Sequence, residues 1–254
     1  MKSSVDLPPT VQVNFTLGIG HGRLDASLEV PSGHVTLTQI LPVLQTLTSN
    51  IVDAATVLVS TEGYQVSCRA GCGACCRQLV PLSIFEAEFL TEWIHSLPAM
   101  QQQALNARFN TTVDALKATN LLPRLLTPHL WQEEDLEART LAADYLEQEI
   151  PCPFLHDESC SIHPIRPLIC REYLVTSDPV FCARPTRETV VPIPIPLKSS
   201  SVLFGLGSLV EEGTTGWIPL PLLFVWMQTG GTPGQAIEGL GHELLHEFVK
   251  RYTS

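Results

Sequence analysis

Basic residues are scarce in this sequence: 15 Lys and Arg stand against 26 Asp and Glu, which gives a formal net charge of -11 over 254 residues. A nucleic-acid surface needs clustered Lys and Arg, so we expect no nucleic-acid partner. The start of the chain, Met1–Asp6, also lacks the apolar segment of a signal peptide. We therefore expect a cytoplasmic protein, in which cysteines stay reduced.

Long apolar runs are scarce as well. The run near the C-terminus, Ile218–Met227, contains prolines and is shorter than the roughly 20 residues that a membrane-spanning helix needs, so we expect no membrane partner. The absence of internal repeats and of low-complexity linkers favours one globule. Within it we expect 1–62 as strands and a helix packed on the core, 63–185 as a cysteine-cluster metal-binding domain, and 186–254 as an extended segment and helices.

The hydrophobic periodicity predicts an α+β fold that is mostly helical. Residues 11–17 and 24–30 have the alternating, β-branched character of strands, and Gly18–Gly22 between them is typical of a hairpin turn. A Gly-x-Gly-x-Gly loop that held a nucleotide or S-adenosylmethionine would have to open a helix. The residues after this loop alternate like a strand and reach Pro31, which favours the hairpin.

Helical spacing of apolar residues covers much of the remaining chain. Thr38 to about Ser60 predicts a helix that leads into the first cysteines, and Ser83-x-x-Glu86 is a capping box that starts the next helix. Val190–Pro196 contains alternating prolines, which forbid a helix and favour an extended path. Further helices are expected over 105–116, 138–149, 202–210, 220–228 and 232–252.

The eight cysteines fall into two groups. Four lie in Cys68–Cys76, and four lie between Cys152 and Cys182. Thiolates are ligands for soft metals and iron-sulfur clusters, and Gly71 and Gly73 would permit the tight turns that point several sulfurs inward. Four disulfides are the alternative, which the lack of a secretory signal disfavours.

The two cysteine groups are expected to meet in space, because closing a loop costs entropy only logarithmically with its length. Eight thiols could then form two closed zinc sites, one cluster plus one zinc, or one four-cysteine cluster with extra thiols nearby. The neighbours Cys75 and Cys76 are expected to point apart in an extended backbone, so that they serve different metals or one stays free. These alternatives remain open at this point, as does the choice between a structural and a catalytic role.

Three motifs, taken in order, resemble the YkgJ-like cysteine-cluster family over residues 68 to 182. They are Cys68-x3-Cys72-Gly-Ala-Cys75-Cys76, then Cys152-Pro-Phe-Leu, then Cys160-Ser-Ile-His-Pro-Ile-Arg-Pro-Leu-Ile-Cys170-Arg. That family is described as a zinc- or iron-chelating domain, so the resemblance implies zinc or, favoured here, an iron-sulfur cluster. The expected partner is this metal ion or cluster, and a protein partner of unknown kind is left open. The resemblance implies a metal-ligand role for all eight cysteines: Cys68, Cys72, Cys75, Cys76, Cys152, Cys160, Cys170 and Cys182.

The family motif also includes Arg166 and Arg171, on either side of Cys170. Because arginine stays charged, both could hydrogen-bond sulfur or offset the charge of several thiolates around the cofactor. His163 stands where the family implies an aromatic residue. We expect a polar loop residue there rather than a further ligand.

A methyl-transfer enzyme is an alternative function. One class of the family is flagellin lysine N-methylase, and Cys68-x3-Cys72-x2-Cys75 has the spacing of a radical S-adenosylmethionine cluster. Three cysteines would leave one iron open for that cofactor. The predicted helical surroundings, in place of an α/β barrel, disfavour this alternative.

A second motif, His242-Glu-Leu-Leu-His246, matches the His-Glu-x-x-His pattern of zinc hydrolases. The apolar stripe of the predicted helix leaves both histidines facing solvent, and little chain follows them to supply a third ligand. We expect a solvated amphipathic helix here. A zinc hydrolase, with Glu243 activating water, is the third alternative.

Overall fold

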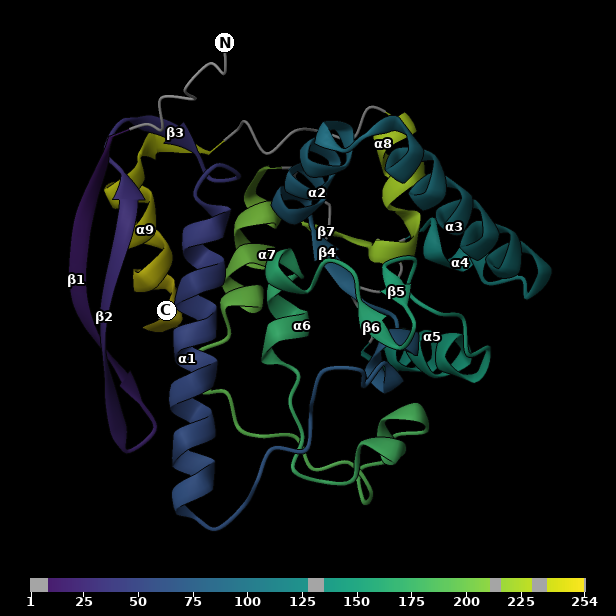
Figure 1. The fold of residues 1–254 in the computed structure, drawn as a ribbon, viewed down its shortest axis with the longest axis horizontal. Helices are drawn as coiled ribbons and strands as arrows, with labels where there is room; N and C mark the ends of the chain where they lie inside the picture. Colours follow the sequence, from purple (N-terminus) through teal and green to yellow (C-terminus); the bar gives the residue numbers. More distant parts are fainter. Residues whose placement is uncertain (1–8, 128–134, 211–215, 230–236, 254) are drawn as a thin grey trace.

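The computed structural model describes residues 9–127, 135–210, 216–229 and 237–253. Helices account for most of the regular structure in these residues, and a long β-hairpin stands at the N-terminal end (Figure 1). The predicted α+β, mostly helical fold is therefore confirmed. The other described strands form two-stranded antiparallel sheets, which pair β3 (His34–Thr36) with β8 (Glu238–Leu240), β4 (Pro81–Ser83) with β7 (Trp217–Pro219), and β5 (Leu155–His156) with β6 (Ser159–Cys160).

The helices predicted between residues 38 and 228 are confirmed, with ends that shift by a few residues. The α-helices are α1 (Leu41–Thr61), α2 (Ile84–Ser96), α3 (Ala99–Ala118), α4 (Leu122–Leu125), α5 (Asp135–Glu147), α6 (Leu168–Glu172), α7 (Ser199–Val210), α8 (Leu223–Gln228) and α9 (Gly241–Lys250). The 3-10 helices are η1 (Ala74–Arg77), η3 (His163–Ile165), η4 (Pro179–Ala183), η5 (Leu220–Leu222) and η7 (Arg251–Thr253).

The N-terminal hairpin consists of β1 (Thr10–Ile19) and β2 (Gly22–Pro31), paired from Thr10 opposite Pro31 to Ile19 opposite Gly22. Gly20 has a φ of 56° in the turn, a left-handed conformation that glycine adopts at little cost. The predicted hairpin is confirmed, and the glycine-rich stretch is its turn rather than the start of a helix. Alternate residues of both strands are buried, among them Leu17, Ile19, Ala26, Leu28 and Val30.

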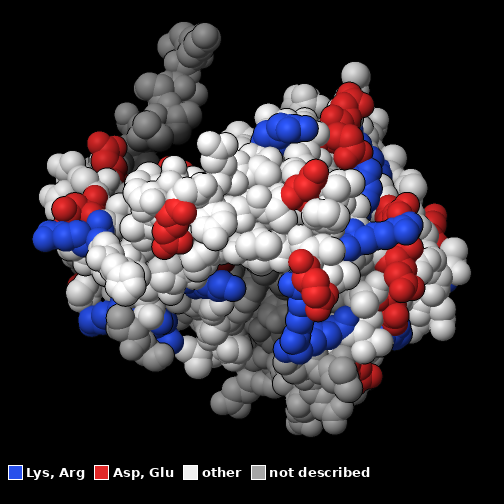
Figure 2. Space-filling model, turned by 90° about the horizontal axis from the view of Figure 1, so that it is seen from below, with Lys and Arg blue, Asp and Glu red and all other residues white. Residues whose placement is uncertain are grey.

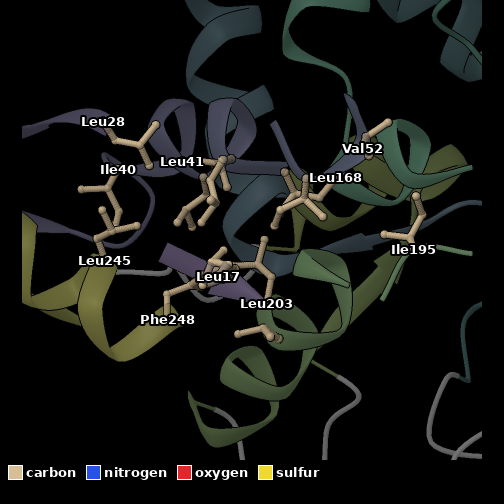
Figure 3. Packing of buried hydrophobic residues seen from close by; sticks show 14 of the residues in the cluster. Leu17, Leu28, Ile40, Leu41, Val52, Leu168, Ile195, Leu203, Leu245 and Phe248 are labelled. Carbon is tan, nitrogen blue, oxygen red and sulfur yellow. The ribbon is translucent and has the colours of Figure 1, made fainter. Parts of the chain in front are cut away.

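The main hydrophobic core is built around α1, which packs against β2 and α6. By length and composition α1 is, within the described ranges, the one helix that could cross a membrane. Its residues Leu44, Leu47 and Ile51 are fully buried in this core. Figure 3 shows side chains from distant parts of the chain converging here, including Leu17 and Leu28 of the hairpin, Leu41 and Val52 of α1, Leu168 of α6, Leu203 of α7, and Leu245 and Phe248 of α9.

The predicted capping box at the start of α2 is confirmed. Ser83 Oγ accepts a 3.1 Å hydrogen bond from the Glu86 amide, and Glu86 Oε2 accepts one of 3.1 Å from the Ser83 amide. The other carboxylate oxygen, Glu86 Oε1, accepts a 2.7 Å hydrogen bond from the amide of Leu168. One buried carboxylate therefore joins the first turn of α2 to the first turn of α6.

A second core lies between α2, α3 and α8. The Phe109 ring packs edge-on against Phe154 at 5.4 Å and against Phe224 at 4.4 Å between ring centroids, the geometry that aromatic quadrupoles favour. Phe154 and Ile162 of this core stand on either side of β5 and β6, next to the second cysteine group. The packing of this core therefore fixes the position of that group.

The C-terminal helix is shorter than the sequence predicts. Residues 238–240 form β8, which pairs with β3, and α9 begins only at Gly241. A Cβ atom at Gly241 would collide with the Pro31 carbonyl, so this helix starts in close contact with the hairpin. The first part of the predicted 232–252 helix lies outside the described residues. The extended path predicted for 190–196 is confirmed, with a bridge between Val175 and Pro192.

Candidate metal centre

All eight cysteines are free thiols, and all eight line one cavity of about 450 Å³. The two cysteine groups, distant in sequence, therefore meet in space. Figure 2 shows the molecule from below, where a face with charged side chains of both signs is hollowed near its centre. Across the described ranges, no three His, Cys, Asp or Glu side chains converge closely enough to hold a metal ion as they stand. The thiols thus share one cavity, but their present arrangement does not form a coordination site.

The first cysteine group enters the cavity on an irregular loop. Gly71 has a φ of 80°, which confirms the expected left-handed turn. Gly73 is required for a different reason: a Cβ atom there would lie 2.9 Å from Leu155 Cδ1 and 2.5 Å from Glu158 Oε2. The missing side chain lets η1 approach the turn between β5 and β6.

Cys75 and Cys76 stand on η1 and not on an extended backbone, so the expectation that they point apart is wrong. A 3-10 turn places consecutive side chains about 120° apart instead of on opposite faces. A side-chain hydrogen bond with Cys76 is the main cause of the raised pKa of Cys75, with burial second. The two sulfurs therefore lie next to each other.

The second cysteine group is joined to the first through the main chain. The Cys152 amide donates a 2.7 Å hydrogen bond to the Cys76 carbonyl. Arg77 reinforces this contact with two hydrogen bonds to Glu158, from Nη1 to Oε2 at 3.1 Å and from Nη2 to Oε1 at 2.7 Å. Because Glu158 is in the turn that connects β5 to β6, this ion pair positions Cys160 as well.

Cys170 and Cys182 are held by short helices. Cys170 is on α6, whose first turn is fixed by Glu86 and by the fully buried Leu168. Cys182 is on η4, where the Asp178 side chain accepts a 3.0 Å hydrogen bond from the amide of Val180 and caps the helix. With 3% of its surface exposed, Cys182 is the one buried cysteine.

Burial controls the acidity of these thiols. It raises the pKa of Cys152 to about 12 and is the main reason that the pKa of Cys182 rises to about 11, from the ordinary 9.0. Burial is also the leading cause of the raised pKa of Cys68, Cys160 and Cys170. These five thiols are therefore protonated at neutral pH until something replaces the protons.

The two arginines have different surroundings. Arg171 donates from Nε to the Arg166 carbonyl at 3.1 Å, from Nη1 to Ser49 Oγ at 3.1 Å, and from Nη2 to the Pro164 carbonyl. Its donors therefore hold the 164–166 backbone. Arg166 lines the cavity, and its Nε is buried without a hydrogen-bond partner among the described residues.

Two other polar residues border the thiols. His163 lines the cavity but is exposed, and burial of its ring, followed by the charges of Arg166 and Arg171, lowers its pKa. Tyr173, which the sequence reasoning missed, shares a hydrogen bond with Cys182 and accepts one of 3.3 Å from Gln78 Nε2. Its position, three residues after Cys170, is the sequence feature that could have identified Tyr173 as part of the site.

The donor set fits a soft metal or an iron-sulfur cluster, because eight thiols and a guanidinium face one cavity. The histidines of the second motif do not contribute. His242, Glu243 and His246 are exposed on α9, which confirms the expected solvated face. An α/β barrel is also not found in the part of the chain that the structure describes, where all sheets are two-stranded and antiparallel.

Comparison with protein families gives a match over residues 67–186, to the CxxCxxCC family, which is described as "Putative zinc- or iron-chelating domain". The matched segment contains all eight cysteines together with Arg166 and Arg171. No curated protein and no solved structure matches the chain.

Proposed function

We propose that this is a cytoplasmic metal-binding protein whose two cysteine groups together hold the metal, because residues 67–186 match the CxxCxxCC family, described as "Putative zinc- or iron-chelating domain". The observation that supports the proposal most strongly is the common cavity, which every cysteine of the chain lines. A reducing compartment is consistent with eight free thiols.

We favour iron, bound as an iron-sulfur cluster, over zinc. Both a closed zinc site and a cluster take four cysteine sulfurs from the protein, but a cluster also needs room for its own iron and sulfide, which the cavity of about 450 Å³ provides. When bound, a cluster supplies electron-transfer chemistry, whereas zinc supplies a rigid cross-link without redox chemistry.

The residues of this chain have separate tasks in such a site. The thiols bind the metal after losing their protons. Arg166, whose buried Nε has no partner among the described residues, donates to thiolate sulfur and offsets its charge. Arg171 holds the carbonyls of Pro164 and Arg166, and it thereby keeps Arg166 directed into the cavity.

Metal content measured by elemental analysis, with an absorption spectrum, on protein purified without oxygen tests the proposal. Wild type should contain iron with acid-labile sulfide and a broad visible band, and the variant Cys72→Ala/Cys75→Ala should lose most of it. The matched control His242→Ala/His246→Ala changes two exposed ligand-type side chains on α9 and should keep the wild-type content. Zinc without iron would overturn the preference for a cluster. Wild-type protein without either metal would overturn the proposed function.

A further inference from the structure

The cysteines fall into two packing environments within the common cavity. Cys68 and Cys182 belong to a small apolar cluster with Val175 and Val190. Cys152 and Cys160 pack instead against the second core, which contains Phe154, Ile162 and eight other buried residues. Cysteines that share a cavity are therefore supported by different parts of the fold.

The segment around Cys68 and Cys182 is held mainly by hydrogen bonds between loops and to η4 rather than by a large core. Ser67 donates through its amide at 2.9 Å and its Oγ at 3.1 Å to the Val175 carbonyl. This contact joins the loop before Cys68 to the segment that leads to Cys182. Three buried residues, one of which is Cys182 itself, form the core of this region.

The segment around Cys152, Cys160 and Cys170 is anchored more firmly. Cys160 is in β6, and Cys170 is on α6, where the fully buried Leu168 reaches the main core. The carboxylate of Glu86 fixes the amide of Leu168 at 2.7 Å. These three cysteines therefore keep their places through contacts with both large cores.

We propose that the eight thiols form two separate metal sites, one held by loops and one anchored to the cores. Cys68, Cys72 and Cys182 belong to the loop-held site, and Cys152, Cys160 and Cys170 belong to the anchored site. The neighbours Cys75 and Cys76, on η1 between the two sets, supply the fourth sulfur of each. This inference rests on the proposed metal-binding function and adds the number of sites and their ligands.

The packing around η1 agrees with this division. Cys72 lies on the same loop as Cys68, where its amide donates a 3.2 Å hydrogen bond to the Arg69 carbonyl. η1 packs against η4, which carries Cys182, and the Cys76 carbonyl of η1 accepts a 2.7 Å hydrogen bond from the Cys152 amide. η1 therefore contacts both sets of cysteines.

Arg166 lines the cavity that both sets share, and its Nε is buried without a hydrogen-bond partner among the described residues. One guanidinium can therefore offset the negative charge of both filled sites.

The two sites should differ in how readily they release metal. Metal binding to loops also orders them, so part of the binding free energy is used to fix the chain. The anchored set is already fixed by the cores, and it should therefore hold its metal longer. A chelator should remove the metal in two phases, with the loop-held site emptied first.

Titration with Co²⁺ under anaerobic conditions, followed by thiolate-to-cobalt absorption, tests the division into two sites. Wild type should saturate at two equivalents, and Cys182→Ser and Cys170→Ser should each saturate at one. Loss of all cobalt in either variant, or one equivalent in wild type, would overturn the two-site division while leaving metal binding intact. Wild type that binds no cobalt, iron or zinc would overturn the proposed function itself.

Limited trypsin digestion of the metal-loaded wild type provides a test that needs no variant. During the first phase of chelation, cleavage after the exposed Arg69 and Arg187 should accelerate at least several-fold, because both residues lie on the loops of the loop-held site. Cleavage after Arg23, exposed at the hairpin, should stay constant. Release of all the metal in one phase would contradict the claim that the two sites release metal at different rates. The same claim would be contradicted if trypsin cleaved the loops at the same rate before and after metal loss.

Discussion

The main-chain amide of Cys152 donates a 2.7 Å hydrogen bond to the main-chain carbonyl of Cys76. This bond joins the backbone of the first cysteine group directly to that of the second. The Arg77–Glu158 ion pair and the glycine at position 73 support it from the same side. The assembly of the site therefore depends on η1 lying closely against the turn between β5 and β6.

Replacing Gly73 with alanine should separate these elements. The new Cβ would lie 2.9 Å from Leu155 Cδ1 and 3.2 Å from Glu158 Cα, so η1 or the turn must shift. We expect metal content to fall by at least half, as measured by elemental analysis. Gly205→Ala is the matched control, because nothing lies within 4 Å of the added atom on α7. Equal metal content in both variants would show that the close approach is not needed.

The Phe109 ring should be among the largest single contributors to stability near the site. It is fully buried and packs against Phe154 and Phe224. Phe109→Ala should lower the free energy of unfolding by about 3–5 kcal/mol, the usual cost of removing a buried phenyl ring. Chemical denaturation of the metal-free protein measures this loss. Phe181→Ala, at a side chain that is 42% exposed, should cost far less.

Metal affinity should rise with pH across the neutral range. The pKa of Cys152 is about 12 and that of Cys182 about 11 in the folded protein, against an ordinary 9.0, so metal binding must displace protons. Competition with a chelator at several pH values measures the slope, and a flat profile would contradict protonated thiols. The metal-free protein should behave in the opposite way, because its unfolded thiols ionise first. Its free energy of unfolding should therefore fall as pH rises from 9.0 toward the folded pKa values.

The His-Glu-x-x-His motif should be inactive as a hydrolase centre. Its three polar side chains are exposed on α9, far in sequence from the cysteines. Glu243→Gln should leave both the metal content and any peptidase or esterase background of the preparation unchanged. A hydrolytic activity that disappears in this variant would restore the zinc-hydrolase alternative.

Local patterns in the sequence predicted much of the fold. The alternation of β1 and β2, the apolar spacing of α1 and the Ser83–Glu86 capping box each depend on neighbouring residues, and each is confirmed. The strands β3 and β8 are only three residues long and pair across the chain. Their pairing, and therefore the late start of α9, depends on distant contacts that no local pattern records.

The meeting of the two cysteine groups was predicted, but its geometry was not. Clustering in the sequence indicated that the thiols gather, and the common cavity agrees. The conformation of Cys75 and Cys76 depends on η1, which is set by the close approach at Gly73. The hydrogen bond from the Leu168 amide to Glu86 could not be predicted either, because a capping-box motif does not indicate that the same carboxylate also binds a residue far away in the sequence.

X-ray absorption at the edge of the bound metal tests the central claim most directly. If the thiols of the common cavity are the ligands, the first shell should contain sulfur alone, at about 2.3 Å for zinc or for the iron of a cluster. Any metal that remains in Cys72→Ala/Cys75→Ala should have fewer sulfur neighbours, and the first shell should stay unchanged in His242→Ala/His246→Ala. A first shell dominated by nitrogen or oxygen in the wild-type protein would contradict the account.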